Sequence, residues 1–282
     1  MLKAVFIGGL TNGKIVYDYL KTNRFVDLCL AVTHPDDFSG ARHVKFDDGK
    51  RIIKADSVKL YVQEIKTLSP DVIFVAGWSE LIPKELLGLP PMGVIGFHPA
   101  KLPNDRGRSV LAWQIEEGYT ETALTMFRYS DYPDGGDILA QERIVIEESD
   151  YISDVLDKVD EATYSMMRAY FPLLRQGLLM ARRQDLSEGN FRRLRGEKDS
   201  EINWDKPAKS IYNKIRAISR PYPGAFADLG SKRYRIWRSE VLLDFPIGQR
   251  EKPGTLVASC YDSSLVVKAR NGFIRITEWD AE

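Results

Sequence analysis

Two polar side chains stand where the chain could carry out proton transfer. His98 follows the apolar run 94–97, and Pro99 and Pro103 stiffen the backbone behind it. Asp134 lies in a turn rich in proline and glycine, where regular strand pairing ends. Imidazole changes its charge near neutral pH, and a carboxylate can orient the ring and stabilise its charged form. The pair indicates general acid–base catalysis, although a single histidine at a strand end more often has a structural role.

The elements that must position these two residues alternate between strands and helices. Helical patterns begin near Val16, Val58 and Ile152. Four short apolar runs predict buried strands, at 4–7, 28–33, 72–76 and 94–97. This alternation predicts an α/β fold with a Rossmann-like, doubly wound, mostly parallel sheet, in which ligands bind beyond the carboxyl ends of the strands. His98 is expected at such an end.

The remainder of the chain predicts a second, smaller domain. Strand-like runs flank the Asp134 turn, and a long helix from Ile152 is expected to kink at Pro172. The charged stretch that follows has no sustained apolar face, which is typical of a linker. We therefore predict a catalytic domain at 1–185, a linker at 186–200 and a small OB-like β-barrel at 201–282.

Composition narrows the class of protein. The 282 residues include 40 Lys and Arg and 40 Asp and Glu, so no net charge attracts the chain to nucleic acid or to an anionic membrane. No apolar run approaches the roughly 18 residues of a membrane span. Cys29 and Cys260 lack the spacing of a disulfide framework or a zinc site, which favours a reducing cytoplasm and no metal. The oligomeric state stays open, with a homodimer as one alternative.

The first turn and the other histidines have simpler interpretations. The segment from Gly8 to Lys14 fits the spacing of a phosphate-binding loop, but Ile15 stands where a magnesium-binding Ser or Thr is required. A tight strand-to-helix turn is the better interpretation. His34 and His43 lie in the polar stretch 34–50 without partner spacing, and we expect both at the surface.

A longer pattern surrounds the two candidate residues. The chain has His98-Pro99 followed by Leu102-Pro103 and Arg106-Gly107, and further on Asp134-x-Gly136-Asp137-Ile138. In this order the motifs resemble the folate-dependent formyltransferases, whose pattern is N-x-H-P-x-x-L-P, then R-G, then D-x-G-[D/Q]-I. That family includes the glycinamide ribonucleotide, methionyl-tRNA and amino-sugar-nucleotide enzymes.

The resemblance implies a reaction and a set of site residues. The chain would transfer a formyl group from 10-formyltetrahydrofolate to an amine. His98 would relay a proton, and Asp134 would orient the imidazole ring or hold a bridging water. The amine substrate is expected near Gly9, Thr11, Arg106 and Gly107. The pterin ring is expected at two segments: Gly77, Trp78, Ser79, Glu80, Leu81 and Ile82, and Asp131 and Tyr132. Trp78 and Leu81 could instead be core residues.

One position departs from the family pattern. Gly96 stands where the family has an asparagine, whose amide is thought to stabilise the oxyanion. We hypothesise that Asn104, on the loop after His98, supplies the missing amide, or that a backbone N–H does so. Asn104 could equally be a turn residue.

The C-terminal stretch bears on the substrate. Segments 203–207, 211–217 and 221–225 resemble the two-domain branch of the family, which acts on methionyl-tRNA or on nucleotide-linked amino sugars. The loop 34–38 has mixed charge rather than the basic residues expected of a tRNA enzyme, whereas the basic run 192–195 points the other way. We favour a small nucleotide-linked amino sugar, with methionyl-tRNA as the alternative. With Gly96 in place, a folate-binding protein with weakened catalysis is a third interpretation.

Overall fold

The computed structural model describes residues 1–47 and 51–281, and it divides into two compact units. The first unit comprises 1–107, 122–144 and 157–191, and the second comprises 108–121, 145–156 and 192–282. Residues 48–50, at the end of the predicted polar stretch 34–50, and residue 282 lie outside the described residues. The linker predicted at 186–200 stays a prediction.

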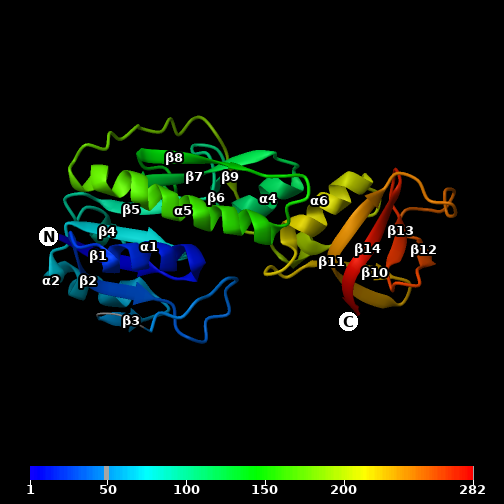
Figure 1. Cartoon of the computed structure of the whole chain (residues 1–282), viewed down its shortest axis with the longest axis horizontal. Coiled ribbons are helices and arrows are strands. Elements are labelled where there is room, and N and C mark those ends of the chain that lie inside the picture. Colours follow the sequence, from blue (N-terminus) through cyan, green and yellow to red (C-terminus); the bar gives the residue numbers. More distant parts are fainter. Residues whose placement is uncertain (48–50, 282) are drawn as a thin grey trace. The chain divides into compact units, whose positions relative to one another are not determined.

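The first unit is built on a seven-stranded sheet in the order β3-β2-β1-β4-β5-β7-β8 (Figure 1). Strands β1 to β5 pair in parallel, and β7 runs antiparallel to β5. The strands are β1 Leu2–Gly8, β2 Val26–Thr33, β3 Ile52–Lys54, β4 Val72–Ala76, β5 Val94–His98, β7 Glu121–Arg128 and β8 Ile138–Val145. The predicted mostly parallel, doubly wound sheet is confirmed, and its four apolar strands correspond to β1, β2, β4 and β5.

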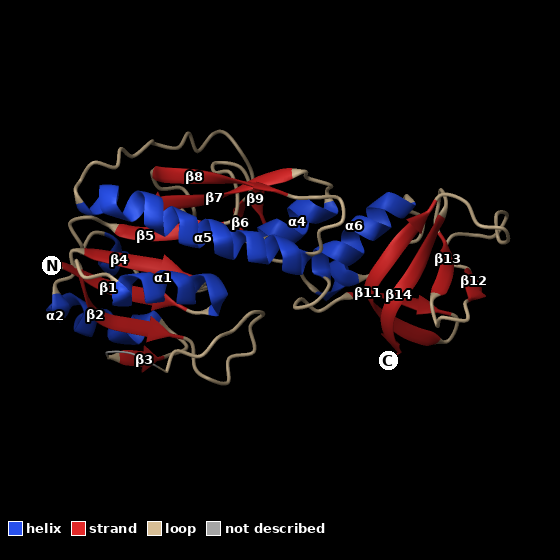
Figure 2. Cartoon of the chain, in the orientation of Figure 1, coloured by secondary structure: helices blue, strands red, loops and turns tan. Residues whose placement is uncertain are grey.

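Helices cover both faces of this sheet, as almost wholly apolar strands require. They are α1 Leu10–Thr22, the 3₁₀ helix η1 Val58–Tyr61, α2 Val62–Leu68, α3 Lys84–Leu87 and α5 Ile152–Arg175. Figure 2 shows α1 and α5 lying across one face, where Phe171 of α5 contacts Phe74 and Tyr19. None of the helices within 1–47 and 51–281 is long and apolar enough to cross a membrane.

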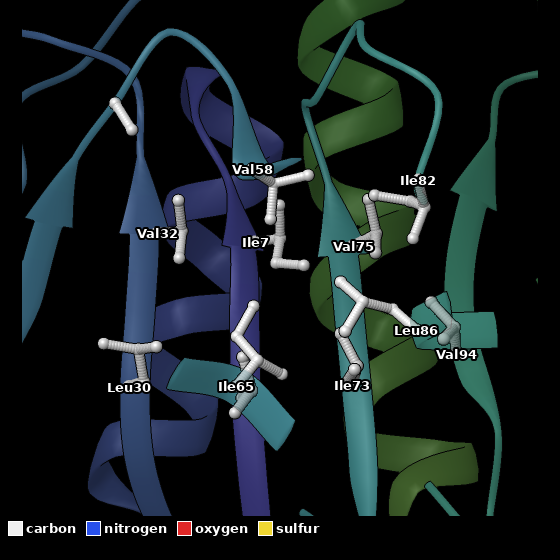
Figure 3. Close-up of a cluster of buried hydrophobic side chains, with 12 residues drawn as sticks. Ile7, Leu30, Val32, Val58, Ile65, Ile73, Val75, Ile82, Leu86 and Val94 are labelled. Atoms are coloured by element: carbon white, nitrogen blue, oxygen red, sulfur yellow. The ribbon is translucent and has the colours of Figure 1, made fainter. Parts of the chain in front are cut away.

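The opposite face holds the core shown in Figure 3. Ile7, Leu30 and Ile73 project from three neighbouring strands toward Ile65 of α2 and Leu86 of α3, and all five are fully buried or within 1% of it. Burying one such side chain stabilises the fold by roughly 1.5 to 3 kcal/mol. This packing fixes β4 and β5, and therefore the position of His98 at the end of β5.

The second unit contains a separate five-stranded antiparallel sheet in the order β10-β11-β14-β13-β12. Its strands are β10 Ala225–Leu229, β11 Lys232–Leu242, β12 Leu256–Ser259, β13 Leu265–Lys268 and β14 Phe273–Ala281. The pairing of β11 with β14 shifts register around Trp237, and such bulges bend a strand and increase its twist. The sheet is accordingly curled, which confirms the predicted class of the C-terminal part.

Short elements complete both units. Helix α6 Ala208–Ile218 packs on β11 and on α4 Val110–Glu116 in the second unit, and η2 Glu197–Ser200 precedes it. Strands β6 Arg106–Gly107 and β9 Phe191–Arg192 form a two-stranded ladder. The sequence did not predict these two-residue strands, because two residues carry no recognisable period.

Candidate active site

The first glycine turn is a close-packed turn between β1 and α1. A Cβ atom at Gly8 would lie 2.0 Å from the Ala76 carbonyl oxygen of β4, and one at Gly13 would lie 2.5 Å from the same oxygen. Lys14 pairs with Asp18 one helical turn along α1, at 2.7 Å. The glycines therefore allow the backbones to approach, as the tight-turn interpretation predicts. That Gly9 and Thr11 bind substrate stays a prediction.

His98 lies buried at the carboxyl end of β5, with each ring nitrogen in a different environment. Nε2 is 2.7 Å from the backbone carbonyl oxygen of Asp105. A carbonyl oxygen only accepts, so Nε2 carries the proton and donates it to this bond. Nδ1 lies 3.7 Å from Oδ1 of Asp134. In the neutral ring the unprotonated, basic nitrogen is therefore the one that faces the carboxylate.

Asp134 is held by a backbone N–H and by a side-chain amide. Its φ of +53° places it in the left-handed region, and its Oδ2 accepts a hydrogen bond from the Gly107 N–H at 2.8 Å. The side-chain amide of Gln184 donates to the carbonyl oxygens of Asp134, at 2.9 Å, and of Gly136, at 2.5 Å. A Cβ at Gly136 would lie 1.7 Å from the Arg128 carbonyl oxygen, so only glycine fits. The D-x-G motif is thus a rigid turn that presents one carboxylate oxygen to His98.

The loop after His98 is anchored by a segment about 80 residues further along the chain. The Asp105 N–H donates to Oδ1 of Asn190 at 2.6 Å, and the Asn190 amide donates back to Oδ1 of Asp105 at 3.0 Å. The Arg106 guanidinium donates to the carbonyl oxygens of Leu186 and Glu188, at 3.3 and 3.0 Å. The sequence analysis did not predict that Gln184 and Asn190 hold this part of the candidate site, because no local pattern joins residues so distant in the chain.

The position where the family has an asparagine is filled by an aromatic ring. A Cβ at Gly96 would lie 2.1 Å from Cε2 of Tyr129, which is closer than any real contact. The Tyr129 ring stacks on Phe127, with ring centroids 5.1 Å apart. Asn104 is exposed, and its backbone N–H donates to Lys101 at 3.1 Å. Within the described residues, no contact joins the Asn104 side chain to His98 or Asp134. Its catalytic role stays a prediction.

The first segment expected to bind the pterin starts with an aromatic stack. Gly77 has a φ of +65° directly after β4, a conformation that favours glycine. The Trp78 ring lies on His34 at 4.4 Å between centroids, and His34 lies on Phe38 at 3.9 Å, in nearly parallel planes. The prediction that His34 is a surface residue was wrong, since it is only 7% exposed and burial lowers its pKa.

The other residues expected at the pterin point in different directions. Glu80 accepts from the Ser57 hydroxyl and the Val58 N–H, at 2.8 and 3.0 Å, and so caps η1. Ile82 belongs to the core, whereas Leu81 is 68% exposed and is not a core residue. Ser79 is also exposed. In the second segment, Asp131 pairs with Lys84 at 3.5 Å, and Tyr132 is exposed. Contact of these residues with a pterin stays a prediction.

In the second unit, the basic run 192–195 is paired with carboxylates of its own chain. Arg193 and Arg195 also stack on the Trp113 ring, 4.9 and 4.1 Å from its centroid. The three ion pairs are Arg192 with Glu117 at 2.6 Å, Arg193 with Asp199 at 2.6 Å, and Arg195 with Glu116 at 2.5 Å.

Comparison with known families gives two matches that together cover most of the chain. Residues 2–170 match the family described as formyl transferase, and residues 196–282 match the formyl transferase C-terminal domain. A methionyl-tRNA formyltransferase from Caldanaerobacter subterraneus subsp. tengcongensis is 31% identical over 268 residues, which are 91% of this chain and 85% of that protein.

Solved structures share the fold at lower identity. HypX from Aquifex aeolicus superposes on 99% of this chain with a TM-score of 0.72 and 19% identity, and this chain spans 44% of that protein. An N-formyltransferase from Helicobacter canadensis, in complex with folinic acid and dTDP-3-aminofucose, superposes with a TM-score of 0.71 and 15% identity, covering 99% of this chain and 100% of that one.

Proposed function

Because the chain belongs to the formyl transferase family, we propose that it transfers the formyl group of 10-formyltetrahydrofolate to the amino group of a nucleotide-linked amino sugar. The pair His98 and Asp134 supports the chemistry, since it places a basic nitrogen against a fixed carboxylate at the end of β5. We choose a sugar nucleotide over tRNA as the acceptor because the arginines of the basic run 192–195 form ion pairs with carboxylates of this chain.

The first step joins the amine to the formyl carbon. The nitrogen lone pair forms the new C–N bond, and the carbonyl π electrons move onto oxygen. The attacking nitrogen becomes acidic as it bonds, and Nδ1 of His98 takes its proton. The resulting imidazolium has one N–H on the Asp105 carbonyl oxygen and the other facing the Asp134 carboxylate. Each N–H of the imidazolium therefore faces an oxygen atom.

The second step returns the carbonyl and releases the folate nitrogen. The oxygen lone pair re-forms the double bond, the bond between carbon and the folate nitrogen breaks, and that nitrogen takes the electron pair. His98 then gives up its proton to the leaving nitrogen and regains its neutral form. The Gly107 N–H donates to the second oxygen of Asp134 at 2.8 Å and so fixes the orientation of the carboxylate beside the ring. The residue therefore orients and stabilises the imidazolium without exchanging a proton.

The segment after β4 fits a flat heterocycle with an amide edge. Such a ring needs an apolar slot together with a few backbone donors and acceptors. Gly77 exposes backbone at a left-handed turn, and the Trp78 ring provides a flat apolar wall. The Trp78 Nε1 is buried without a hydrogen-bond partner within the described residues, so this donor is unused in the protein alone. We propose that Gly77 and Trp78 hold the pterin of the formyl donor.

The charge of the second unit favours a small acceptor over tRNA. An enzyme that grips a tRNA acceptor arm needs Lys and Arg side chains free to contact phosphates. Arg192 and Arg195 are instead only 17% and 9% exposed and are paired with Glu117 and Glu116. A phosphate that approached these two arginines would have to compete with their carboxylates, whereas Arg193 is 64% exposed and pairs with Asp199 at the surface. The basic run was the feature of the sequence that favoured tRNA, and its arginines form ion pairs with carboxylates of the same chain.

Methionyl-tRNA remains the second candidate acceptor, on the strength of the 31% identity to a methionyl-tRNA formyltransferase. The third interpretation, a folate-binding protein with weakened catalysis, follows from Gly96 in place of the asparagine. The three differ in which molecule, if any, gains a formyl group.

Incubation of the protein with 10-formyltetrahydrofolate and a panel of acceptors tests the proposal. The panel holds 3-amino and 4-amino sugars linked to dTDP or UDP, together with methionyl initiator tRNA, and mass spectrometry detects the formyl group. We expect product on an amino-sugar nucleotide, and no product with His98→Ala. Product on tRNA alone would transfer the assignment to the second candidate. Folate binding with no product on any amine would establish the third.

A further inference from the structure

The row of side chains that leads to His98 along β5 contains a gap. Side chains at alternate positions of a strand share one face, so Val94, residue 96 and His98 point the same way. Gly96 contributes no side chain, and the Tyr129 ring takes its place from the neighbouring strand. Gly96 pairs with Phe127 of β7, and the Tyr129 N–H donates to the Val94 carbonyl oxygen at 2.8 Å. Tyr129 thus lies on the face of the sheet that carries His98.

The ring of Tyr129 is held firmly in this position. It stacks on Phe127 with an angle of 21° between the planes, and it packs against two groups of buried side chains. One group includes Val94 and Ile82, and the other consists of Leu102, Phe127 and Ile138. Packing on several sides restricts the ring, so the position of its hydroxyl is fixed by the fold.

The Tyr129 hydroxyl is a donor that nothing else uses. The side chain is half-buried, and its hydroxyl makes no hydrogen bond to another described residue, so it is able to donate to a ligand. Burial raises its pKa, and the negative charge of Asp134 raises it further. The hydroxyl therefore keeps its proton at neutral pH and lies within the field of the catalytic carboxylate.

The backbone donors of the neighbouring loop are already in use. The N–H of Asn104 donates to Lys101, that of Asp105 to the side chain of Asn190, that of Arg106 to the backbone of Asn190, and that of Gly107 to Asp134. A backbone N–H at 104–107 could reach an oxyanion only by leaving its present partner. This disfavours the backbone alternative to the missing asparagine.

We propose that the Tyr129 hydroxyl donates a hydrogen bond to the oxyanion formed when the amine attacks the formyl carbon, in place of the amide absent at Gly96. The proposal rests on the proposed formyl transfer. The Tyr129 ring fits at this place only because residue 96 has no side chain, so the identities of residues 96 and 129 depend on each other. A neutral donor suits this role because it stabilises the developing negative charge without competing with Asp134 for the proton of His98.

The first test removes only the hydroxyl. We expect Tyr129→Phe to lower kcat by roughly a hundredfold, the typical loss for one oxyanion donor, with little change in the affinity for 5-formyltetrahydrofolate. Two rates are measured for each protein, formyl transfer to the amine and formyl loss to water, because both pass through an oxyanion. Tyr164→Phe, an exposed tyrosine of α5, is the matched control and should keep both rates.

The second test exchanges the donor. Tyr129→Ala should lose as much rate as Tyr129→Phe, and adding Gly96→Asn to it should restore at least about tenfold, since the cavity now accepts an amide donor. Gly96→Asn alone should be poorly active, because its Cβ would meet the Tyr129 ring. Circular dichroism and the melting temperature show whether each variant is folded.

The outcomes separate this proposal from the proposed function. Wild-type transfer to an amine with a fully active Tyr129→Phe would overturn the role of Tyr129 and leave the function intact. Formyl loss to water alone would overturn the amine acceptor while still testing Tyr129. A wild-type protein that releases formyl by neither route would overturn both.

Discussion

The loop 98–107 of the first unit and the segment 192–199 of the second are both rich in polar groups, but they use them differently. In segment 192–199 each arginine of the basic run has a carboxylate partner. In the loop the backbone N–H groups of 104–107 are used, yet His98 Nδ1 lies 3.7 Å from Asp134, beyond hydrogen-bonding distance. On the same face of the sheet, the Tyr129 ring lies over Gly96, and its hydroxyl makes no hydrogen bond to another described residue.

The difference shows where a reaction can take place. Ion-paired side chains near the surface contribute little stability, and a substrate that binds them has to compete with the carboxylate already there. Polar groups with unused capacity lower stability, and proteins retain them where they bind or react. The rigid anchors around the loop, Asn190 and Gln184, keep the unused groups in place. Substitutions in the loop 98–107 and its anchors should therefore affect catalysis, whereas substitutions in segment 192–199 should affect stability.

The largest effect is expected at the pair itself. His98→Ala removes the base and should lower kcat by about a thousandfold, within the usual range for general acid–base catalysis. Asp134→Asn keeps an oxygen for the Gly107 N–H but loses the charge that faces the imidazolium, and should cost about a hundredfold. Steady-state kinetics with the acceptor found above measures both. His43→Ala, a histidine outside the site, serves as control, and normal turnover in both site variants would refute the mechanism.

A smaller effect is expected where the loop is anchored. Asn190→Ala removes both hydrogen bonds to Asp105, whose carbonyl oxygen fixes the His98 ring. Each such bond contributes about 1 kcal/mol to stability, so the loop loses about 2 kcal/mol in all. We expect kcat to fall by up to about thirtyfold, the full equivalent of that loss, with little change in KM. A positioning role should also shift the acidic limb of the pH profile of kcat, because the imidazolium loses a fixed acceptor.

The comparison variant for this prediction is Asn23→Ala, at the end of α1, which should leave the pH profile unchanged. If Asn190→Ala lowers the melting temperature but keeps kcat and its pH profile, the residue has only a structural role. The loop would then hold His98 without help from the segment 184–190.

Local pattern was enough to predict some of this site. The apolar run 94–97 and the proline after it located His98, and the turn residues located Asp134. The strands of the parallel sheet are apolar along their length and were predicted for that reason. The start of α1 at Leu10 was missed, because the glycine turn hides its first helical residues.

The rest depends on contacts that no local pattern contains. Asn190 and Gln184 contact residues 48 to 85 positions away. The Tyr129 ring fits where it does because Gly96, on the neighbouring strand, has no side chain there. His34 was expected in solvent because its sequence neighbours are polar, whereas rings from two other positions, Phe38 and Trp78, cover it.

The paired segment should respond in stability rather than in activity. Asp199 holds Arg193 through two oxygens and also accepts from the Gly196 N–H, and these contacts lower its pKa. Because the pKa of this carboxyl is lower in the folded chain than in the unfolded chain, its ionisation stabilises the fold at every pH above the unfolded pKa. This stabilisation is lost as the pH falls through the folded pKa. Asp199→Asn should therefore lower the melting temperature at pH 7 by about 1 to 3 °C, as expected for a largely solvent-screened ion pair.

The difference between wild type and Asp199→Asn should shrink steadily below the ordinary carboxyl pKa of about 3.8. Calorimetry across that range gives the measurement, and Glu197→Gln, exposed in the same segment, is the control. Formyl transfer to the small acceptor should be unchanged. A large loss of transfer would mean that the segment takes part in catalysis, and the contrast between the two segments would fail.

The smallest effect is expected at Asn104, and it decides between two donors. The residue is exposed, and the bond recorded for it is that of its backbone N–H to Lys101, which belongs to the turn. If Tyr129 supplies the donor, Asn104→Ala should keep kcat/KM within about twofold of wild type, since a turn residue contributes little to the transition state. A loss near a hundredfold would instead return the role to the Asn104 amide. Asn104→Ala, Tyr129→Phe and the double variant are measured side by side. If Tyr129 is the oxyanion donor, the double variant should be no slower than Tyr129→Phe alone; if Asn104 is the donor, it should be no slower than Asn104→Ala alone.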